Sequence, residues 1–126
     1  MKSNIGNVVK ISQFIETHKK DKINFNVAFK LSKIANSISS DMNFFKEKYQ
    51  EILDECAEKD EKGAFVTTKD NIKLKEDKIT IYIQKENELF NCETDLPDDI
   101  TFSPQDFENM QITIEELQPF SVFIKE

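Results

Sequence analysis

Apolar residues recur along the first half of the chain with the period of an α-helix. Val8, Ile11 and Ile15 are spaced three to four residues apart near the N-terminus. This spacing predicts a short amphipathic helix over residues 7–19, with Asn7 at the N-cap position. Such a helix buries one apolar stripe and leaves its polar face to solvent.

A longer apolar stripe follows this first helix. Its nine members recur at gaps of three or four residues, about 3.6 on average, with no Gly or Pro between them. The pattern predicts one continuous helix over residues 26–58, roughly 50 Å long. Since so long a helix outgrows a compact domain, we expect it to pack against an antiparallel helix or a second copy of the chain. The stripe consists of Val27, Leu31, Ile34, Ile38, Met42, Phe45, Tyr49, Ile52 and Cys56.

The segment over residues 76–91 fits two structures. Isoleucines at alternate positions of residues 79–83 are typical of a β-strand. The same segment also has an apolar face with helical spacing. We favour a helix that returns along the long helix, because this forms an antiparallel helical hairpin. A β-hairpin built from residues 64–68 and 78–84 is the alternative.

The last third of the chain combines short β segments with capping signals. Residues 91–96 and 100–102 are typical of short strands, separated by a turn at residues 97–99. A Ser-Pro pair followed by Asp at residues 103–106 predicts an N-cap and a single helical turn. The Thr-Ile-Glu-Glu sequence at residues 113–116 is a capping box that opens a short final helix.

These segments predict a single helix-dominated α+β domain over residues 1–126. Its main feature is a long antiparallel helical hairpin, with a small β element and a short C-terminal helix. A chain of 126 residues is too short for two ordinary domains, and its eleven Phe can build a core. No run of 18 apolar residues and no apolar segment near the N-terminus occurs, so we expect no membrane span and no secretory signal.

Charge is distributed unevenly along the chain. Residues 1–53 carry nine lysines against five acidic residues, a net charge of +4, whereas residues 54–126 carry eight against nineteen, a net charge of −11. This asymmetry allows head-to-tail self-association or docking on a basic partner, although a solvated acidic surface is the simpler interpretation. All 17 basic residues are lysines. Without the bidentate fork of arginine, we expect no direct nucleic-acid binding.

Patterns that carry catalysis or metal binding are scarce. His18 is the only histidine, and we interpret it as a surface residue at a helix end rather than a general base. Cys56 and Cys92 are 36 residues apart and are expected to be reduced. Two acidic groups lack the spacing of a calcium loop and are interpreted as solvated turns. We therefore expect no enzyme activity, no metal and no cofactor. The acidic groups are Asp95, Asp98 and Asp99, and Asp54, Glu55 and Glu58.

Four segments carry a family resemblance. They are Ala28–Ile34, Tyr49–Ala57 running into Lys59–Gly63, Glu86–Phe90, and Ile112–Phe120. Together they resemble an uncharacterised family of small proteins encoded by phages and prophages, especially of low-GC bacteria. The resemblance covers about residues 8–124 and implies a phage origin. It also implies a long helix, an acidic turn ending in Gly, a returning helix and a strand–helix tail, without catalytic residues.

These observations predict a non-enzymatic bacteriophage protein that acts by protein–protein contact, most simply a small virion structural or assembly component. It would be located in the virion or the host cytoplasm, with a phage structural protein or a second copy of itself as partner. The alternative is a phage-encoded acidic inhibitor of a host nucleic-acid-handling or defence protein. Phe25 and Phe29 lie off the main stripe and widen its apolar sector. The expected contact residues are Phe44, also off the stripe, and an acidic turn formed by Asp54, Glu55, Glu58, Asp60 and Glu61.

Overall fold

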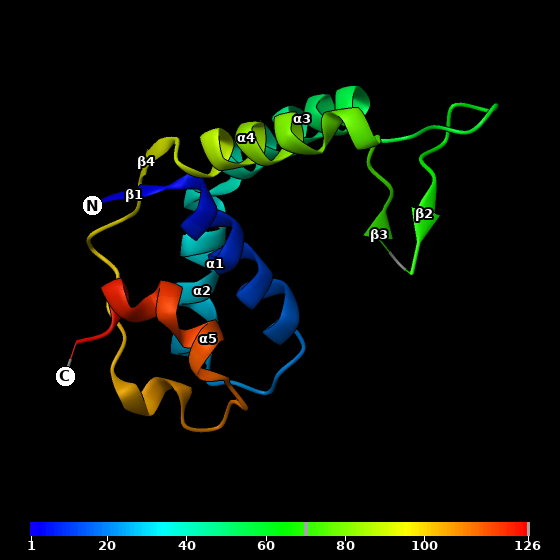
Figure 1. Ribbon diagram of the computed structural model, residues 1–126. Helices are drawn as coiled ribbons and strands as arrows, with labels where there is room; N and C mark the ends of the chain where they lie inside the picture. Colours follow the sequence, from blue (N-terminus) through cyan, green and yellow to red (C-terminus); the bar gives the residue numbers. More distant parts are fainter. Residues whose placement is uncertain (70, 126) are drawn as a thin grey trace.

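Helices dominate the computed structural model, which describes residues 1–69 and 71–125 (Figure 1). Two helices, α1 (Ile5–His18) and α2 (Phe25–Ser37), form one part of the body. A second pair, α3 (Ser39–Cys56) and α4 (Ile79–Phe90), runs across one end of it as an antiparallel hairpin. The predicted helix-dominated α+β architecture with a helical hairpin is therefore confirmed.

The long apolar stripe folds as two helices, so the prediction of one continuous helix over residues 26–58 is wrong. The helix breaks at Ile38, whose φ of −96° and ψ of 2° lie outside the helical range. Hydroxyl groups on both sides of the break bond to carbonyls at the end of α2: Ser37 Oγ donates to the Ile34 carbonyl and Ser39 Oγ to that of Asn36. Such local bonds compete with helix continuation. Because a single residue separates the helices, the periodicity passes through the break.

The segment over residues 79–90 is helical, as favoured, and the alternative β-hairpin with residues 78–84 is wrong. Helix α4 packs along α3, where the Phe45 ring stacks between those of Tyr49 and Phe90 at centroid distances of 5.4 and 5.9 Å. Leu89 is buried in the same contact. Tertiary packing thus overrides the β propensity of the isoleucines. A 3₁₀ turn, η1 (Glu76–Lys78), precedes α4.

The N-terminus and the segment after α4 meet in a small sheet that the sequence predicts only in part. The expected strand over residues 91–96 is present as β4 (Glu93–Asp95), and it pairs antiparallel with β1 (Lys2–Asn4). Strand β1 has only three residues, too few to show an alternation of apolar and polar positions, so the sequence did not predict it. The expected strand over residues 100–102 is absent from the described segment, where Phe102 forms one isolated bridge to Ile124.

A β-rich arm, residues 57–75, connects α3 to α4 and leaves the helical body (Figure 1). Its strands β2 (Thr67–Thr68) and β3 (Asn71–Ile72) pair antiparallel, and Ala57 pairs with Leu74 at its base. The predicted glycine turn is present, since Gly63 has a φ of +83°. This left-handed conformation favours glycine.

The C-terminal segment follows both predicted capping signals. Ser103 and Asp106 form a capping box for η2 (Pro104–Phe107). Thr113 and Glu116 form another for α5 (Ile114–Leu117), which continues into η3 (Gln118–Phe123). Figure 1 shows this segment lying beside α1.

Two apolar clusters form the core, and α1 contributes to both. Val8, Ile11 and Phe14 join α2 and the C-terminal segment, whereas Ile5 joins the α3–α4 hairpin. The predicted N-cap of α1 at Asn7 is wrong, because the helix begins two residues earlier and the Asn4 side chain accepts from the Asn7 N–H. The first cluster also includes Val27, Leu31, Ile34, Ile38, Leu96, Ile100, Phe102, Phe107, Met110, Phe120 and Phe123, and the second includes Ile52, Cys56 and Leu89.

Candidate functional site

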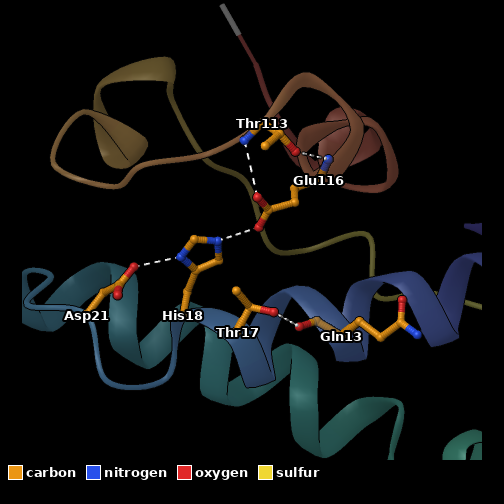
Figure 2. A network of polar contacts seen from close by, with 6 residues as sticks. All are labelled: Gln13, Thr17, His18, Asp21, Thr113 and Glu116. Atoms are coloured by element: carbon orange, nitrogen blue, oxygen red, sulfur yellow. Dashed lines mark hydrogen bonds and ion pairs between the residues drawn. The ribbon is translucent and has the colours of Figure 1, made fainter. Parts of the chain in front are cut away.

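The only histidine lies buried between two carboxylates (Figure 2). The side chain of His18 is 6% exposed. Its Nδ1 lies 2.6 Å from Asp21 Oδ2, and its Nε2 lies 2.6 Å from Glu116 Oε2. The prediction of a surface residue is therefore wrong, although His18 does end α1. Glu116 comes from 98 residues away, so no local pattern could indicate that this helix end is covered.

Each carboxylate is positioned by its own local structure. After α1 the chain turns so that the Asp21 N–H donates to the His18 carbonyl at 3.0 Å, which places the Asp21 side chain beside the ring. Glu116 is held by the capping box of α5. Its Oε1 accepts from the Thr113 N–H at 3.2 Å, and this leaves Oε2 for His18. The predicted capping box thus also supplies a hydrogen-bond partner for the histidine.

Aromatic rings line one side of the histidine. The Phe14 ring lies 4.6 Å from the His18 ring, and the Phe120 ring lies 4.3 Å from that of Phe14. Phe120 belongs to η3, directly after α5. The polar contact of Glu116 and the aromatic contact of Phe120 therefore hold the same C-terminal segment on α1.

The charges around His18 favour its protonated form. Burial lowers the pKa of His18, but the hydrogen bonds and charges of Asp21 and Glu116 outweigh it, so the pKa is raised above its usual value of 6.5. The same hydrogen bond with His18 lowers the pKa of Glu116. With both ring nitrogens bonded to carboxylates, His18 is arranged as a link between two chain segments. The arrangement offers a substrate no free ring nitrogen, in contrast to a general base.

A second polar network lies between α3 and α4. Tyr82 Oη donates to Glu86 Oε2 at 2.5 Å and lies 2.5 Å from Tyr49 Oη. Because the single phenolic proton of Tyr82 goes to Glu86, Tyr49 donates to Tyr82. Burial, followed by the hydrogen bond to Glu86, raises the pKa of Tyr82. The network ties the two helices of the hairpin together.

Three of the predicted contact carboxylates pair with lysines. Asp54 lies 3.1 Å from Lys59 Nζ, and Glu58 lies 3.3 Å from Lys73 Nζ. Glu55 pairs with Lys85 of α4. The hydrogen bonds of Lys59 and Lys85 lower the pKa values of Asp54 and Glu55. These acidic residues therefore lie in mixed-charge pairs at the end of α3 and the base of the arm.

The remaining acidic residues of the predicted turn lie within the arm. Asp60 Oδ1 accepts from the N–H groups of Lys62 and Ala64 at 2.8 and 3.0 Å, so its side chain shapes the turn that contains Gly63. Glu61 is exposed at the same turn. The structure thus divides the predicted acidic turn between a helix end, where Asp54 and Glu55 lie, and the arm.

Phe44 lies at the rim of a groove between α3 and α4. Its side chain is 41% exposed, and Lys48 Nζ lies 5.9 Å from the centre of its ring. The groove has a volume of about 310 Å³, with Ile52, Leu89 and Cys92 among its apolar lining. Both Glu55 and Lys85 stand at this groove. Of the predicted contact residues, the structure brings Phe44 and Glu55 together here.

Further apolar side chains are exposed on the helices, in pairs four residues apart. Phe25 and Phe29 of α2 are 86% and 57% exposed. Ile79 and Ile83 of α4 form a similar pair. The phenylalanines were noted in the sequence because they lie off the apolar stripe. The isoleucine pair was missed, because isoleucines in a helix that packs against another helix are expected to face it.

Comparisons with known proteins give no match to this chain: no family model, no curated protein and no solved structure is similar to it. In the described part of the chain, residues 1–69 and 71–125, no group of three His, Cys, Asp or Glu side chains is placed to hold a metal ion. No helix in these two ranges has the length and apolar character needed to cross a membrane. Cys56 and Cys92 are both free thiols.

Proposed function

We propose that this protein acts by contact with other proteins, as a small structural or assembly component of a bacteriophage particle. The observation that carries the contact role is the arm, which extends away from the helical body (Figure 1). The phage setting rests on the resemblance of segments such as residues 28–34 and 112–120 to a phage-encoded family. Phage structural proteins or a second copy of the chain are the partners.

The arm is built in a way that favours packing on another surface. Its hydrogen bonds run mainly between its own segments, for example from the Lys73 N–H to the Val66 carbonyl at 2.8 Å and from the Val66 N–H to the Glu58 carbonyl at 3.0 Å. A two-stranded hairpin without a covering layer is marginally stable in water. A partner that covers the arm would therefore add to its order.

Exposed apolar pairs on the helical body support the same role. Side chains such as Phe25 and Phe29 occupy successive turns of one helix face, so they form a local apolar surface rather than scattered single residues. The groove at Phe44 adds a further apolar surface with a rim of both charges. Surfaces of this kind are used in protein–protein interfaces.

The alternative, an acidic inhibitor of a host nucleic-acid-handling or defence protein, has weaker support. An imitation of nucleic acid requires unpaired negative charge on the surface. At the predicted acidic turn, Asp54, Glu55 and Glu58 are each paired with a lysine. These pairs lower the net negative charge that the turn presents to a basic partner.

Mass spectrometry of purified particles from the encoding phage, with copy numbers, tests the proposal. We expect many copies of the chain in each particle or in its assembly intermediates. Absence from both, together with a purified protein that is monomeric and binds no phage structural protein, would overturn it. Binding to a host factor that weakens steeply as salt is added would instead support the inhibitor.

A further inference from the structure

The cluster around His18 brings the end of α1 into contact with α5, which lies 98 residues further along the chain. Its ring contacts the loop after α1 through Asp21 and the capping box of α5 through Glu116 (Figure 2). The histidine side chain is 6% exposed, whereas those of Asp21 and Glu116 are 36% and 28% exposed. The proposed function makes no use of this cluster.

We propose that His18, Asp21 and Glu116 form a pH-sensitive clamp, which holds the C-terminal segment over residues 113–123 on α1 at acidic pH and loosens it as the pH rises. The geometry explains why. An imidazolium ring has two N–H groups and can donate to both carboxylates at once, whereas a neutral ring has only one. In the neutral form, the lone pair of the other nitrogen would face a carboxylate oxygen 2.6 Å away. That contact is repulsive and must open.

Opening of the contact between His18 and Glu116 affects a second element, because Glu116 belongs to α5. Asp21 follows His18 by three residues, and a backbone hydrogen bond of 3.0 Å between the two residues keeps it close. Glu116, in contrast, belongs to α5 and bonds the Thr113 N–H through its second oxygen. A displaced Glu116 side chain therefore weakens the capping box as well as the link to α1.

Other charged side chains lie around the cluster. Histidine is the side chain whose ordinary pKa lies near neutral pH, so a change on raising the pH above 6.5 is assigned to His18. Helix α2 contributes apolar and hydroxyl side chains to the adjacent cavity, among them Leu31 and Ser32. Among the described residues, the other charged side chains that line the cavities beside the cluster are Lys10 and Lys19 of α1, Lys22 of the loop and Glu115 of α5. Lys19 is paired with Glu16.

The direction of the effect follows from proton linkage. The pKa of His18 in the folded protein is raised above the value of 6.5 that it has in an unfolded chain. The folded state therefore binds the proton more tightly. The stabilisation is fully present below pH 6.5 and is lost as the pH rises through the folded pKa.

An NMR titration measures the first requirement directly, because His18 gives the only imidazole signals of the chain. We expect its midpoint above 6.5 in the intact protein and a lower midpoint in Glu116→Gln, whose amide oxygen still accepts from Thr113. The matched control is Lys19→Gln, which removes the exposed ion pair with Glu16 and should leave the midpoint almost unchanged. A midpoint at or below 6.5 in the intact protein overturns the clamp.

Amide hydrogen exchange measures the second requirement, the release of the C-terminal segment. After correction for intrinsic rates, we expect exchange in residues 114–123 to accelerate between pH 6 and pH 8. For each unit by which the pKa of His18 differs between the folded and the unfolded protein, the equilibrium constant for opening changes by about tenfold. His18→Gln should lose this pH dependence, and the comparison with it removes any effect of pH that does not involve His18. Equal pH dependence in both proteins overturns the proposal, and Asp21→Asn provides a second test if His18→Gln fails to fold.

Discussion

At the scale of single residues, Phe120 shows how one side chain holds the C-terminal segment. Its ring is fully buried and lies 4.3 Å from the Phe14 ring and 6.0 Å from the Phe123 ring, measured between centroids. The rings of Phe102 and Phe107 surround it at 6.3 and 6.4 Å. Tilted and edge-on pairs at these distances add to the stabilisation from apolar burial.

Truncation of this ring should therefore destabilise the whole domain. We expect Phe120→Ala to lower the free energy of unfolding by about 3–5 kcal/mol, because it removes buried surface and leaves a cavity. The measurement is urea denaturation followed by circular dichroism. Phe25→Ala is the matched control, since Phe25 is 86% exposed, and it should change stability by about 0.5 kcal/mol or less. Equal effects of the two variants would contradict the packing described for Phe120.

The tyrosine network between α3 and α4 makes a prediction about coupling. Tyr82→Phe removes both hydrogen bonds of Tyr82 and should cost about 1–2 kcal/mol, whereas Tyr49→Phe removes one and should cost about 1 kcal/mol. The double variant should cost little more than Tyr82→Phe, because the bond of Tyr49 is already lost. A double-mutant cycle of unfolding free energies measures this. Additive losses would mean that the two hydroxyl groups do not interact.

Residue environments were the part of the site that the sequence could not supply. The apolar spacing before His18 predicted that this residue lies at the end of a helix. Its burial was not, because Glu116 lies 98 residues away and belongs to a helix that looks like an ordinary capped turn. For the same reason, the lysine partners of the acidic residues could not be assigned. Glu55, for example, pairs with Lys85, 30 residues later.

At the scale of elements, helices were predictable wherever one face is apolar, and their ends were less so. The period of 3.6 residues identified α1, α4 and the combined stripe of α2 and α3. It could not reveal the break at Ile38, because one non-helical residue leaves Ile34 and Met42 in phase. Strand β1 could not be predicted, because its three residues acquire their structure by pairing with β4.

The arm provides a prediction at this scale through its glycine. A Cβ at Gly63 would meet no atom within 4 Å, so only its φ of +83° opposes substitution. Gly63→Ala should destabilise the turn by roughly 1–2 kcal/mol, whereas Gly63→Asn should be better tolerated because Asn adopts left-handed conformations more readily. Amide exchange at Ala64 and Val66 should accelerate in the Ala variant, with the urea midpoint of the domain nearly unchanged. Equal acceleration by Ala and Asn would show that the turn does not require a left-handed residue.

At the scale of the whole molecule, the body and the arm have separate sources of stability. Helix α1 joins the two apolar clusters, so the helices and the C-terminal segment share one connected core. From the arm, Leu74 packs against the hairpin cluster, close to the pair that it forms with Ala57. The folding of the body and the proposed contact function of the arm should therefore be separable by mutation.

A deletion tests this separation. Because Ala57 and Leu74 are paired, a two-residue Asn-Gly turn can join them in place of residues 58–73. We expect the shortened chain to keep its helical circular dichroism and its unfolding free energy within about 1 kcal/mol, because Leu74 and both clusters are retained. If the arm makes the proposed contact, the same chain should no longer associate with phage particles in a co-sedimentation assay.

The deletion is informative because it leaves the net charge of the protein unchanged. Residues 58–73 contain four lysines and four acidic residues, so the shortened chain keeps the net charge of −7. Loss of association then reports the loss of a contact surface and not of electrostatic attraction. Retained association that disappears with added salt would contradict a contact role for the arm and support the acidic inhibitor, since most of the excess negative charge lies after residue 73. Phe44→Ala also keeps the net charge, and it tests whether the groove between α3 and α4 contributes to the association.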